Sequence, residues 1–283
     1  MPVCFIDDPN DARIADYANV PEAQLLRERG LFVAEGRLVV RRLLATGLAR
    51  GDGGLGGPVV RRSPLRTRSV LLTESAYAGL REMLGPLEDR LPIYVSDLSL
   101  MRTITGFNIH RGCLALGERP AARGVTDVTA AARRLVILED VADADNVGGV
   151  FRCAAAFGAD GVVLSPRCCD PLYRKAIRTS MGAALHLPFA RLSSWPEGLR
   201  TLQSSGFTLA ALTPRTDAVD IATVDPARFG RLALLVGQEG SGLSPAAEAL
   251  AECRVRIPMA PDVDSLNVAT AAGIAMHRLF AGR

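Results

Sequence analysis

The chain has 283 residues, of which 48% are hydrophobic, and its 33 basic and 30 acidic residues give a net charge of +3. This length suits two modest domains or one large one, and the apolar fraction is ample for a hydrophobic core. The charge balance does not demand a nucleic-acid partner. Charges interrupt every long apolar run and the first residues are not basic, so the sequence predicts neither a transmembrane segment nor a signal peptide.

The cysteine and histidine pattern predicts reduced thiols and no metal site. The six cysteines include no CxxC pair, the adjacent pair at 168 and 169 is poorly suited to a disulfide, and the three histidines are scattered. This pattern is typical of a protein kept in a reducing cytoplasm. Cys153 and Cys253 lie in apolar surroundings, which predicts buried thiols.

The first part of the chain, residues 1–118, predicts a small domain of alternating strands and helices. One strand and one helix are expected within residues 1–30. The apolar periodicity then predicts strands at 31–34, 69–73, 92–96 and 113–116, and helices at 36–47, 74–84 and 97–104. The glycine-rich run 51–57 predicts a loop, and residues 119–132 are the best candidate for a linker.

An arginine-rich segment lies within this first domain. From Arg41 to Arg68 there are seven arginines and one acid, Asp52. Such a segment can bind phosphate groups by displacing their counterions, whereas the alternative is a solvated loop that binds nothing. The candidate phosphate contacts are Arg37, just before this segment, and Arg41, Arg61 and Arg62 within it.

From about residue 133 onward, short apolar strands alternate with helices. Strands are expected at 135–139, 161–164, 207–212, 231–236 and 253–257, and helices at 147–157, 171–182 and 245–251. A last helix is expected to begin with Asp264 or Ser265 as its N-cap. This alternation predicts a mostly parallel sheet covered on both faces, with ligands bound beyond the carboxyl ends of its strands.

Three polar motifs that contain glycine follow strand ends in this second half. They are Asn146-Val-Gly-Gly-Val-Phe-Arg152, Gly237-Gln-Glu-Gly-Ser-Gly242, and the stretch from Ile257 to Gly273. The glycines remove side chains, so that a nucleotide or another backbone segment can come close. The second motif lacks the lysine of a P-loop and the spacing of the dinucleotide fingerprint. Taken singly, each motif also fits an ordinary turn, helix cap or core helix.

Together and in this order, the three motifs resemble those of the SpoU class of RNA ribose methyltransferases, the TrmH family of the SPOUT superfamily. The resemblance covers roughly residues 130–283. Residues 1–118 more weakly resemble an L30e/L7Ae-like RNA-binding domain, through Phe32-Val-Ala-Glu-Gly-Arg37. The resemblance implies an α/β fold with a C-terminal trefoil knot, a catalytic domain over 133–283, a homodimer, S-adenosylmethionine as methyl donor and no metal.

The resemblance also implies roles for individual residues. Arg152 matches the arginine that binds the phosphate of the target nucleotide and is proposed to accept the 2′-hydroxyl proton, although arginine ordinarily stays protonated. Ala144 stands where the family usually has proline. The other residues expected at the catalytic centre are Asn146, Glu239, Ser265 and Asn267. The expected cofactor contacts are Gly237, Ile257, Leu266, Thr213, Val236 and Met259. Further RNA contacts, beside the four arginines named above, are expected at Arg178 and Ser180.

Three other interpretations stay open. The chain could be a non-catalytic RNA-binding protein that keeps the fold, a relative that methylates a base, or a nucleotide-binding α/β enzyme of the Rossmann type. The intact polar residues of all three motifs argue against the first, and the form of the motifs favours ribose over base. The missing dinucleotide fingerprint argues against the third. The sequence does not identify the RNA or the nucleotide.

Overall fold

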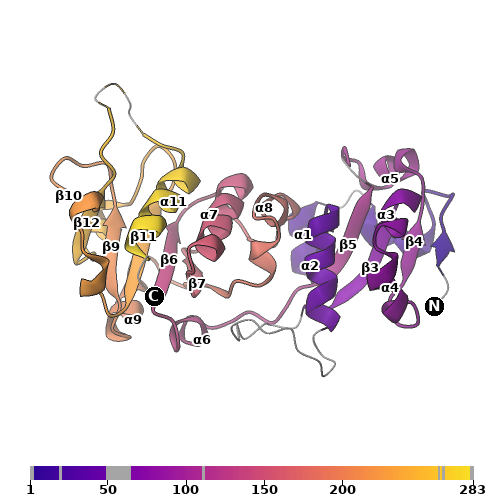
Figure 1. Ribbon diagram of the computed structural model, residues 1–283, viewed down its shortest axis with the longest axis horizontal. Coiled ribbons are helices and arrows are strands. Elements are labelled where there is room, and N and C mark those ends of the chain that lie inside the picture. Colours follow the sequence, from indigo (N-terminus) through magenta and orange to yellow (C-terminus); the bar gives the residue numbers. More distant parts are fainter. Residues whose placement is uncertain are drawn as a thin grey trace. The chain divides into compact units, whose positions relative to one another are not determined.

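The computed structural model describes residues 3–18, 21–48, 65–109, 112–260, 262 and 265–280. The chain forms two compact units, each built on one β-sheet (Figure 1). Unit 1 comprises Met1–Ala121 and Leu172–His186, and unit 2 comprises Ala122–Pro171 and Leu187–Arg283. No helix within the described ranges has the length and apolar character needed to cross a bilayer.

Unit 1 has a five-stranded mixed sheet in the order β1-β4-β3-β5-β2. Its strands are β1 (Cys4–Phe5), β2 (Leu31–Glu35), β3 (Thr67–Leu72), β4 (Ile93–Val95) and β5 (Cys113–Glu118). Its α-helices are α1 (Glu22–Glu28), α2 (Arg37–Leu48), α3 (Glu74–Ala78), α4 (Arg81–Leu84), α5 (Leu98–Thr105) and α8 (Arg174–Thr179). Its 3-10 helices are η1 (Ala12–Tyr17), η2 (Gly85–Leu87) and η3 (Ala183–Leu185).

The strands predicted for the first domain are confirmed within a few residues, because each is a short apolar run bounded by turns. The helix expected over 74–84 instead forms two short helices, α3 and α4, which are separated at Gly79 and Leu80. Between the sheet and η1, the buried side-chain oxygens of Tyr17 and Ser69 hydrogen-bond at 2.9 Å. Each of these two buried hydroxyl groups therefore has a hydrogen-bond partner in the core of unit 1.

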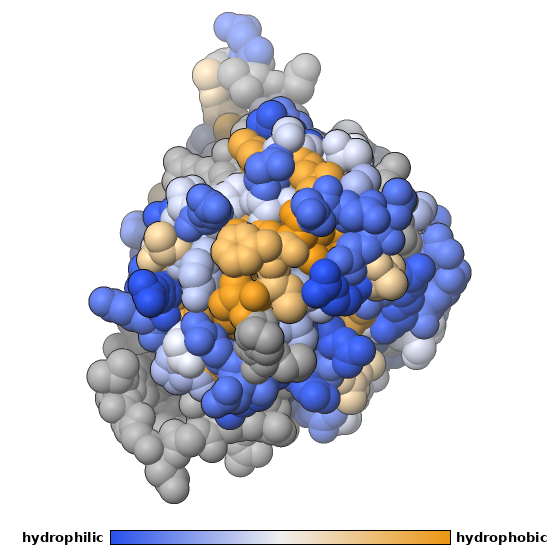
Figure 2. Space-filling model, turned by 90° about the vertical axis from the view of Figure 1, so that its right-hand side faces the viewer, coloured by the Kyte–Doolittle hydropathy of each residue, from blue (hydrophilic) through white to orange (hydrophobic). Residues whose placement is uncertain are grey.

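Unit 1 also exposes apolar surface at the edge of its sheet. Figure 2 shows a hydrophobic patch bordered by hydrophilic residues on one face of this unit. The edge strand β1 carries Phe5, whose residue is 68% exposed, the highest value among the large hydrophobic residues that the structure describes. The apolar residues of this short strand are therefore not all used for the core.

Unit 2 has a seven-stranded sheet in the order β10-β12-β9-β11-β6-β7-β8, in which each neighbouring pair is parallel. Its strands are β6 (Arg134–Glu139), β7 (Gly161–Leu164), β8 (Phe189–Arg191), β9 (Thr208–Leu212), β10 (Val219–Asp220), β11 (Leu232–Gly237) and β12 (Cys253–Arg256). Its helices are α6 (Val125–Thr129), α7 (Ala144–Ala156), α9 (Leu199–Ser204), α10 (Pro245–Glu248), α11 (Val268–Leu279), η4 (Ile221–Thr223) and η5 (Pro226–Arg228). The predicted parallel sheet is confirmed.

Helices cover both faces of this sheet, which explains why its central strands are continuous apolar runs. On one face, α6, α9 and α10 pack against side chains such as Ile137 and Leu235. On the other face, α7 and α11 lie side by side (Figure 1). A Cβ atom at Gly149 of α7 would lie only 2.6 Å from the Cβ of Ala269 on α11. The glycine therefore permits the close approach of the two helices.

Several boundaries differ from the prediction. The last helix, α11, begins after Asn267, so the expectation of an N-cap at Asp264 or Ser265 is wrong. The second half of the expected linker 119–132 contains α6, whose Val128 is buried in the core of unit 2. The helix expected over 171–182 is the shorter α8, which groups with unit 1.

Two other expectations need correction. Strands β8 and β10 have only three and two residues, too short to produce a recognisable apolar run, and the sequence did not predict them. Cys153 and Cys253 are partly exposed rather than buried. Cys153 lies at the α7–α11 contact, where its Sγ would be 3.1 Å from a Cβ added at Gly273.

Candidate active site

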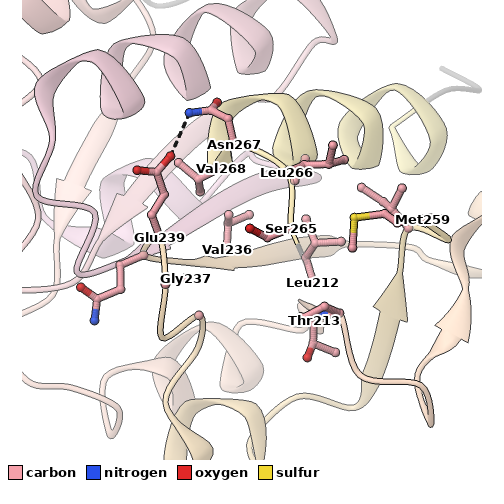
Figure 3. A pocket seen from close by; sticks show the side chains of 16 residues that line it. Leu212, Thr213, Val236, Gly237, Glu239, Met259, Ser265, Leu266, Asn267 and Val268 are labelled. Carbon is pink, nitrogen blue, oxygen red and sulfur yellow. Dashed lines mark hydrogen bonds between the residues drawn. The ribbon is translucent and has the colours of Figure 1, made fainter. Parts of the chain in front are cut away.

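A cavity of about 430 Å³ opens at the carboxyl ends of β9 and β11, next to the segment that follows β12 and the start of α11 (Figure 3). This is the edge at which a parallel α/β sheet binds its ligands. All six residues expected to contact the cofactor line the cavity, as do three of the five expected at the catalytic centre. In chain order, these nine are Thr213, Val236, Gly237, Glu239, Ile257, Met259, Ser265, Leu266 and Asn267.

A glycine loop, residues 238–244, forms one wall of the cavity, and its shape depends on its glycines. Gln238 and Gly242 form an isolated antiparallel bridge, so the loop turns back on itself directly after β11. Gly240 and Gly242 have φ angles of 86° and 68°, which glycine adopts without strain. A Cβ at Gly237 would lie 2.2 Å from the carbonyl carbon of Gly242. A side chain at Gly237 is therefore incompatible with this loop.

Asn267 joins residues from all three motifs. Its Oδ1 accepts hydrogen bonds from the backbone N–H groups of Ala269 and Thr270, at 3.0 and 3.2 Å, and so caps α11. Its Nδ2 donates to Asn146 Oδ1 at 2.8 Å and to Glu239 Oε1 at 2.9 Å, the second of which is drawn in Figure 3. The three motifs, more than a hundred residues apart at their extremes, therefore meet at one side chain.

Arg152 lies on α7 and is exposed. It is six residues beyond Asn146 on the same helix, which corresponds to about 9 Å along the helix axis. Neither Arg152 nor Asn146 is among the described residues that line the cavity. Asn146 still reaches the cavity wall through Asn267, whereas the part played by Arg152 in this chain stays a prediction.

Four arginines of the first domain were expected to contact RNA. Arg37 and Arg41 are exposed on α2, and an Arg37 guanidinium N–H donates to the backbone oxygen of Ser75 at 3.4 Å. Arg61 and Arg62 lie outside the described residues. The exposure of the first two leaves their charge accessible to a phosphate.

The two RNA contacts expected near α8 have different surroundings. Arg178 is partly exposed, and its guanidinium lies 3.8 Å from Glu35 Oε2. Ser180 is only 1% exposed, and its hydroxyl donates to Ile177 O at 3.0 Å and accepts from Ala184 N at 3.3 Å. The prediction that Ser180 contacts RNA is therefore wrong, because both of these bonds are internal and the side chain is buried.

Sequence reasoning missed Glu139, the last residue of β6. It is 3% exposed, and its carboxylate accepts hydrogen bonds from Ser244 N at 2.8 Å and from Trp195 Nε1 at 2.5 Å. Ser244 ends the glycine loop of the cavity. A carboxylate at the end of an otherwise apolar strand was the available signal, but nothing in the sequence indicated its partners.

The next residue, Asp140, is a second buried acid that sequence reasoning missed. It is not a glycine, yet it has a φ of 55°, and it accepts hydrogen bonds from the Ser165 hydroxyl at 2.7 Å and from the Arg167 guanidinium. The bond from Arg167 lowers the pKa of this carboxyl below its usual value, although burial acts in the opposite direction. Asp140 therefore anchors the loop after β7, on the side of β6 away from the glycine loop.

Two solved structures share this fold over nearly the whole chain. An rRNA methyltransferase from Sinorhizobium meliloti with bound AdoMet has a TM-score of 0.78 and 22% identity, covering 98% of this chain and 97% of that one. The SpoU methyltransferase AviRb from Streptomyces viridochromogenes, in complex with AdoMet, has a TM-score of 0.75 and 22% identity, covering 95% and 98%. The architecture is thus the α/β fold of the SpoU methyltransferases.

The sequence comparison gives the family. Residues 133–277 match the SpoU rRNA Methylase family. An uncharacterized tRNA/rRNA methyltransferase of Mycobacterium tuberculosis is 39% identical over 275 residues, which cover 95% of this chain and 89% of that protein. The chain therefore belongs to the SpoU rRNA methylase family, a class of RNA methyltransferases.

Proposed function

We propose that this chain uses S-adenosylmethionine to methylate a ribose 2′-hydroxyl in structured RNA, either rRNA or tRNA. The observation that carries the proposal is the cavity at the strand ends, with the hydrogen-bonded pair of Asn267 and Glu239 in its wall. Membership of the SpoU family supports the reaction class. The AdoMet bound by the similar proteins of S. meliloti and S. viridochromogenes supports the choice of cofactor.

The side chains of the cavity suit this cofactor. The volume of about 430 Å³ is in the usual range for a small-molecule site. Leu212, Ile257, Met259 and Leu266 give apolar walls that can cover an adenine ring. When bound, the cofactor supplies an activated methyl group on a positively charged sulfur. Glu239 adds a carboxylate to the cavity wall, and its negative charge favours a cation there.

Positioning is the main contribution that we assign to the polar residues. Asn267 is fixed by its capping bonds to α11, so its Nδ2 holds Glu239 and Asn146 in place. Ser265 and Asn267 would orient the acceptor ribose from the cavity wall. Arg152 would bind the phosphate of the target nucleotide. Because a guanidinium keeps its proton in ordinary surroundings, we assign Arg152 an orienting and electrostatic role.

The proposal extends to features that the family resemblance implied. Residues 1–118 would form an L30e-like RNA-binding domain, in which the exposed Arg37 and Arg41, together with Arg61 and Arg62, meet phosphate groups. Residues 133–283 would form the catalytic domain with its trefoil knot. The protein would act as a homodimer in the cytoplasm. Light scattering coupled to size exclusion tests the dimer, and a monomer at micromolar concentration would contradict it.

The experiment that tests the function is the substitution Arg152→Ala. We expect the variant to bind S-adenosylmethionine in calorimetry like the wild type but to transfer no methyl group to RNA. Arg200→Ala is the matched control, since Arg200 is exposed on α9, on the opposite face of the sheet from α7. An Arg152→Ala enzyme that methylates RNA at the wild-type rate would contradict the role of Arg152.

Two alternatives are separated by cofactor binding and by the reaction product. A non-catalytic RNA-binding protein need not bind S-adenosylmethionine, so the absence of calorimetric binding would favour it. A base-methylating relative would leave a methylated base rather than a methylated ribose when the product RNA is digested to nucleosides. Mapping ribose methylation across cellular RNAs with and without the gene identifies the substrate, and complementation with Arg152→Ala shows whether the lost site needs this residue.

A further inference from the structure

Glu139 lies where β6 and β11, two strands of unit 2 that are distant in sequence, end side by side. It is the last residue of β6 and pairs in register with Gly237, the last residue of β11. The glycine loop 238–244 leaves the sheet directly after this pair. Glu139 is buried and is not one of the described residues that line the cavity, so its carboxylate is beside the loop rather than in the site.

The carboxylate of Glu139 holds the far end of this loop. Its Oε2 accepts the backbone N–H of Ser244 at 2.8 Å, and its Oε1 accepts the indole N–H of Trp195 at 2.5 Å. Ser244 is also the N-cap of α10, through a bond from Ala247 N at 3.2 Å. The end of the loop is therefore tied both to a central strand and to a helix.

The loop needs such an anchor because its glycines allow many backbone conformations. A Cβ added at Gly240 or Gly242 would meet no atom within 4 Å, so little packs against the loop at these positions. Glycine backbones also lose more conformational entropy on ordering than other residues. Within this loop, Glu239 must be placed so that its Oε1 meets the Nδ2 of Asn267.

We infer that Glu139 is a positioning residue for the cofactor-binding loop: it fixes loop 238–244 through Ser244 and thereby places Glu239 at the cavity. The effect on S-adenosylmethionine binding rests on the proposed function, whereas the anchoring of the loop does not. Trp195 is the chain's single tryptophan. Its hydrogen bond to Glu139 makes its fluorescence a local reporter of the anchor.

The substitution Glu139→Gln isolates this role because it keeps the shape of the side chain. A carboxylate accepts two hydrogen bonds from two N–H donors, but an amide offers one oxygen and one NH₂ group. In Glu139→Gln, either the Ser244 N–H or the Trp195 indole N–H therefore faces the NH₂ group of the amide and loses its acceptor. Asp140→Asn is the matched control, since Asp140 is the adjacent buried acid and bonds Ser165 and Arg167 instead.

Exchange and fluorescence test the anchor, and calorimetry tests its consequence separately. In hydrogen–deuterium exchange on the free protein, we expect peptides covering 238–244 to exchange about tenfold faster in Glu139→Gln than in the wild type. In calorimetry, we expect its Kd for S-adenosylmethionine to rise by about tenfold. In fluorescence spectroscopy of the free protein, we expect the emission maximum of Trp195 to shift. Asp140→Asn should leave both the exchange of 238–244 and the Kd at wild-type values.

Each outcome decides the proposal. Wild-type exchange of 238–244 in Glu139→Gln overturns it, as does equally fast exchange in Asp140→Asn, which would indicate general loosening of the end of β6. Faster exchange with an unchanged Kd would overturn the link to the cofactor. If the wild type itself does not bind S-adenosylmethionine, the proposed function fails, while the exchange data still test the anchor. Should Glu139→Gln not fold, Glu139→Met provides the same exchange test, because it keeps the length of the side chain and removes the acceptor of the Ser244 N–H. Unchanged exchange of 238–244 in that variant would overturn the proposal.

Discussion

Asn267 performs two tasks that substitution can separate. Its Oδ1 caps α11 through Ala269 N and Thr270 N, and its Nδ2 links Asn146 to Glu239. Asn267→Ala removes both sets of bonds. Asn267→Ser removes the link but keeps a short side-chain oxygen, and serine caps helices about as well as asparagine.

The geometry gives the size of each effect. Loss of an N-cap costs about 1 kcal/mol of stability. Each Nδ2 bond adds a net contribution of roughly 0.5–1 kcal/mol, because both lie at exposed or partly buried positions. We therefore expect Asn267→Ala to lose about 2–3 kcal/mol from the free energy of unfolding of unit 2, and Asn267→Ser about 1–2 kcal/mol.

Urea unfolding followed by tryptophan fluorescence is the direct assay, since the single tryptophan, Trp195, lies in unit 2. Both variants should also lose most methyl transfer, because Glu239 is no longer held by Nδ2. Equal stability of the alanine and serine variants would show that the cap contributes nothing. Wild-type methyl transfer by Asn267→Ser would refute the idea that the link between the motifs matters for the reaction.

Two further predictions concern packing and pH. Gly149→Ala places a Cβ 2.6 Å from that of Ala269, so we expect unit 2 to lose about 1–3 kcal/mol of stability in the same urea assay. Adding Ala269→Gly should restore part of this loss. If the double variant recovers no stability, the packing argument is contradicted. The pKa of Asp140 is lower in the folded state than the value of about 3.9 for an unfolded aspartate, so the ionised carboxylate stabilises the folded state at pH values above that unfolded value. This stabilisation disappears as the pH falls through the lower pKa of the folded state. Asp140→Asn should therefore cost about 1 kcal/mol at pH 7, limited by the 81% exposure of the Arg167 side chain. The cost should shrink as the pH falls below the unfolded carboxyl pKa, and a constant difference at all acidic pH values would contradict the assignment.

Much of unit 2 follows from local sequence. Continuous apolar runs such as 135–138 and 232–236 are typical of strands buried on both faces, so the parallel sheet was predictable from them. The motif pattern also placed all six candidate cofactor contacts at one cavity. Ligands of such a sheet bind at the carboxyl edge of its strands, so residues that follow different strands gather there even though they are far apart in the chain.

What the sequence alone determined about this protein is its fold class, its motifs and the edge of the sheet at which they meet, because these depend on periodicity and on the chemistry of short stretches. The tertiary structure alone decided that Asn267 caps α11, that Glu139 holds Ser244, and that Ser180 is buried. It also decided that residues 172–186 group with unit 1. Each of these depends on which distant segment lies against a residue, and that is set by long-range packing rather than by the neighbours along the chain.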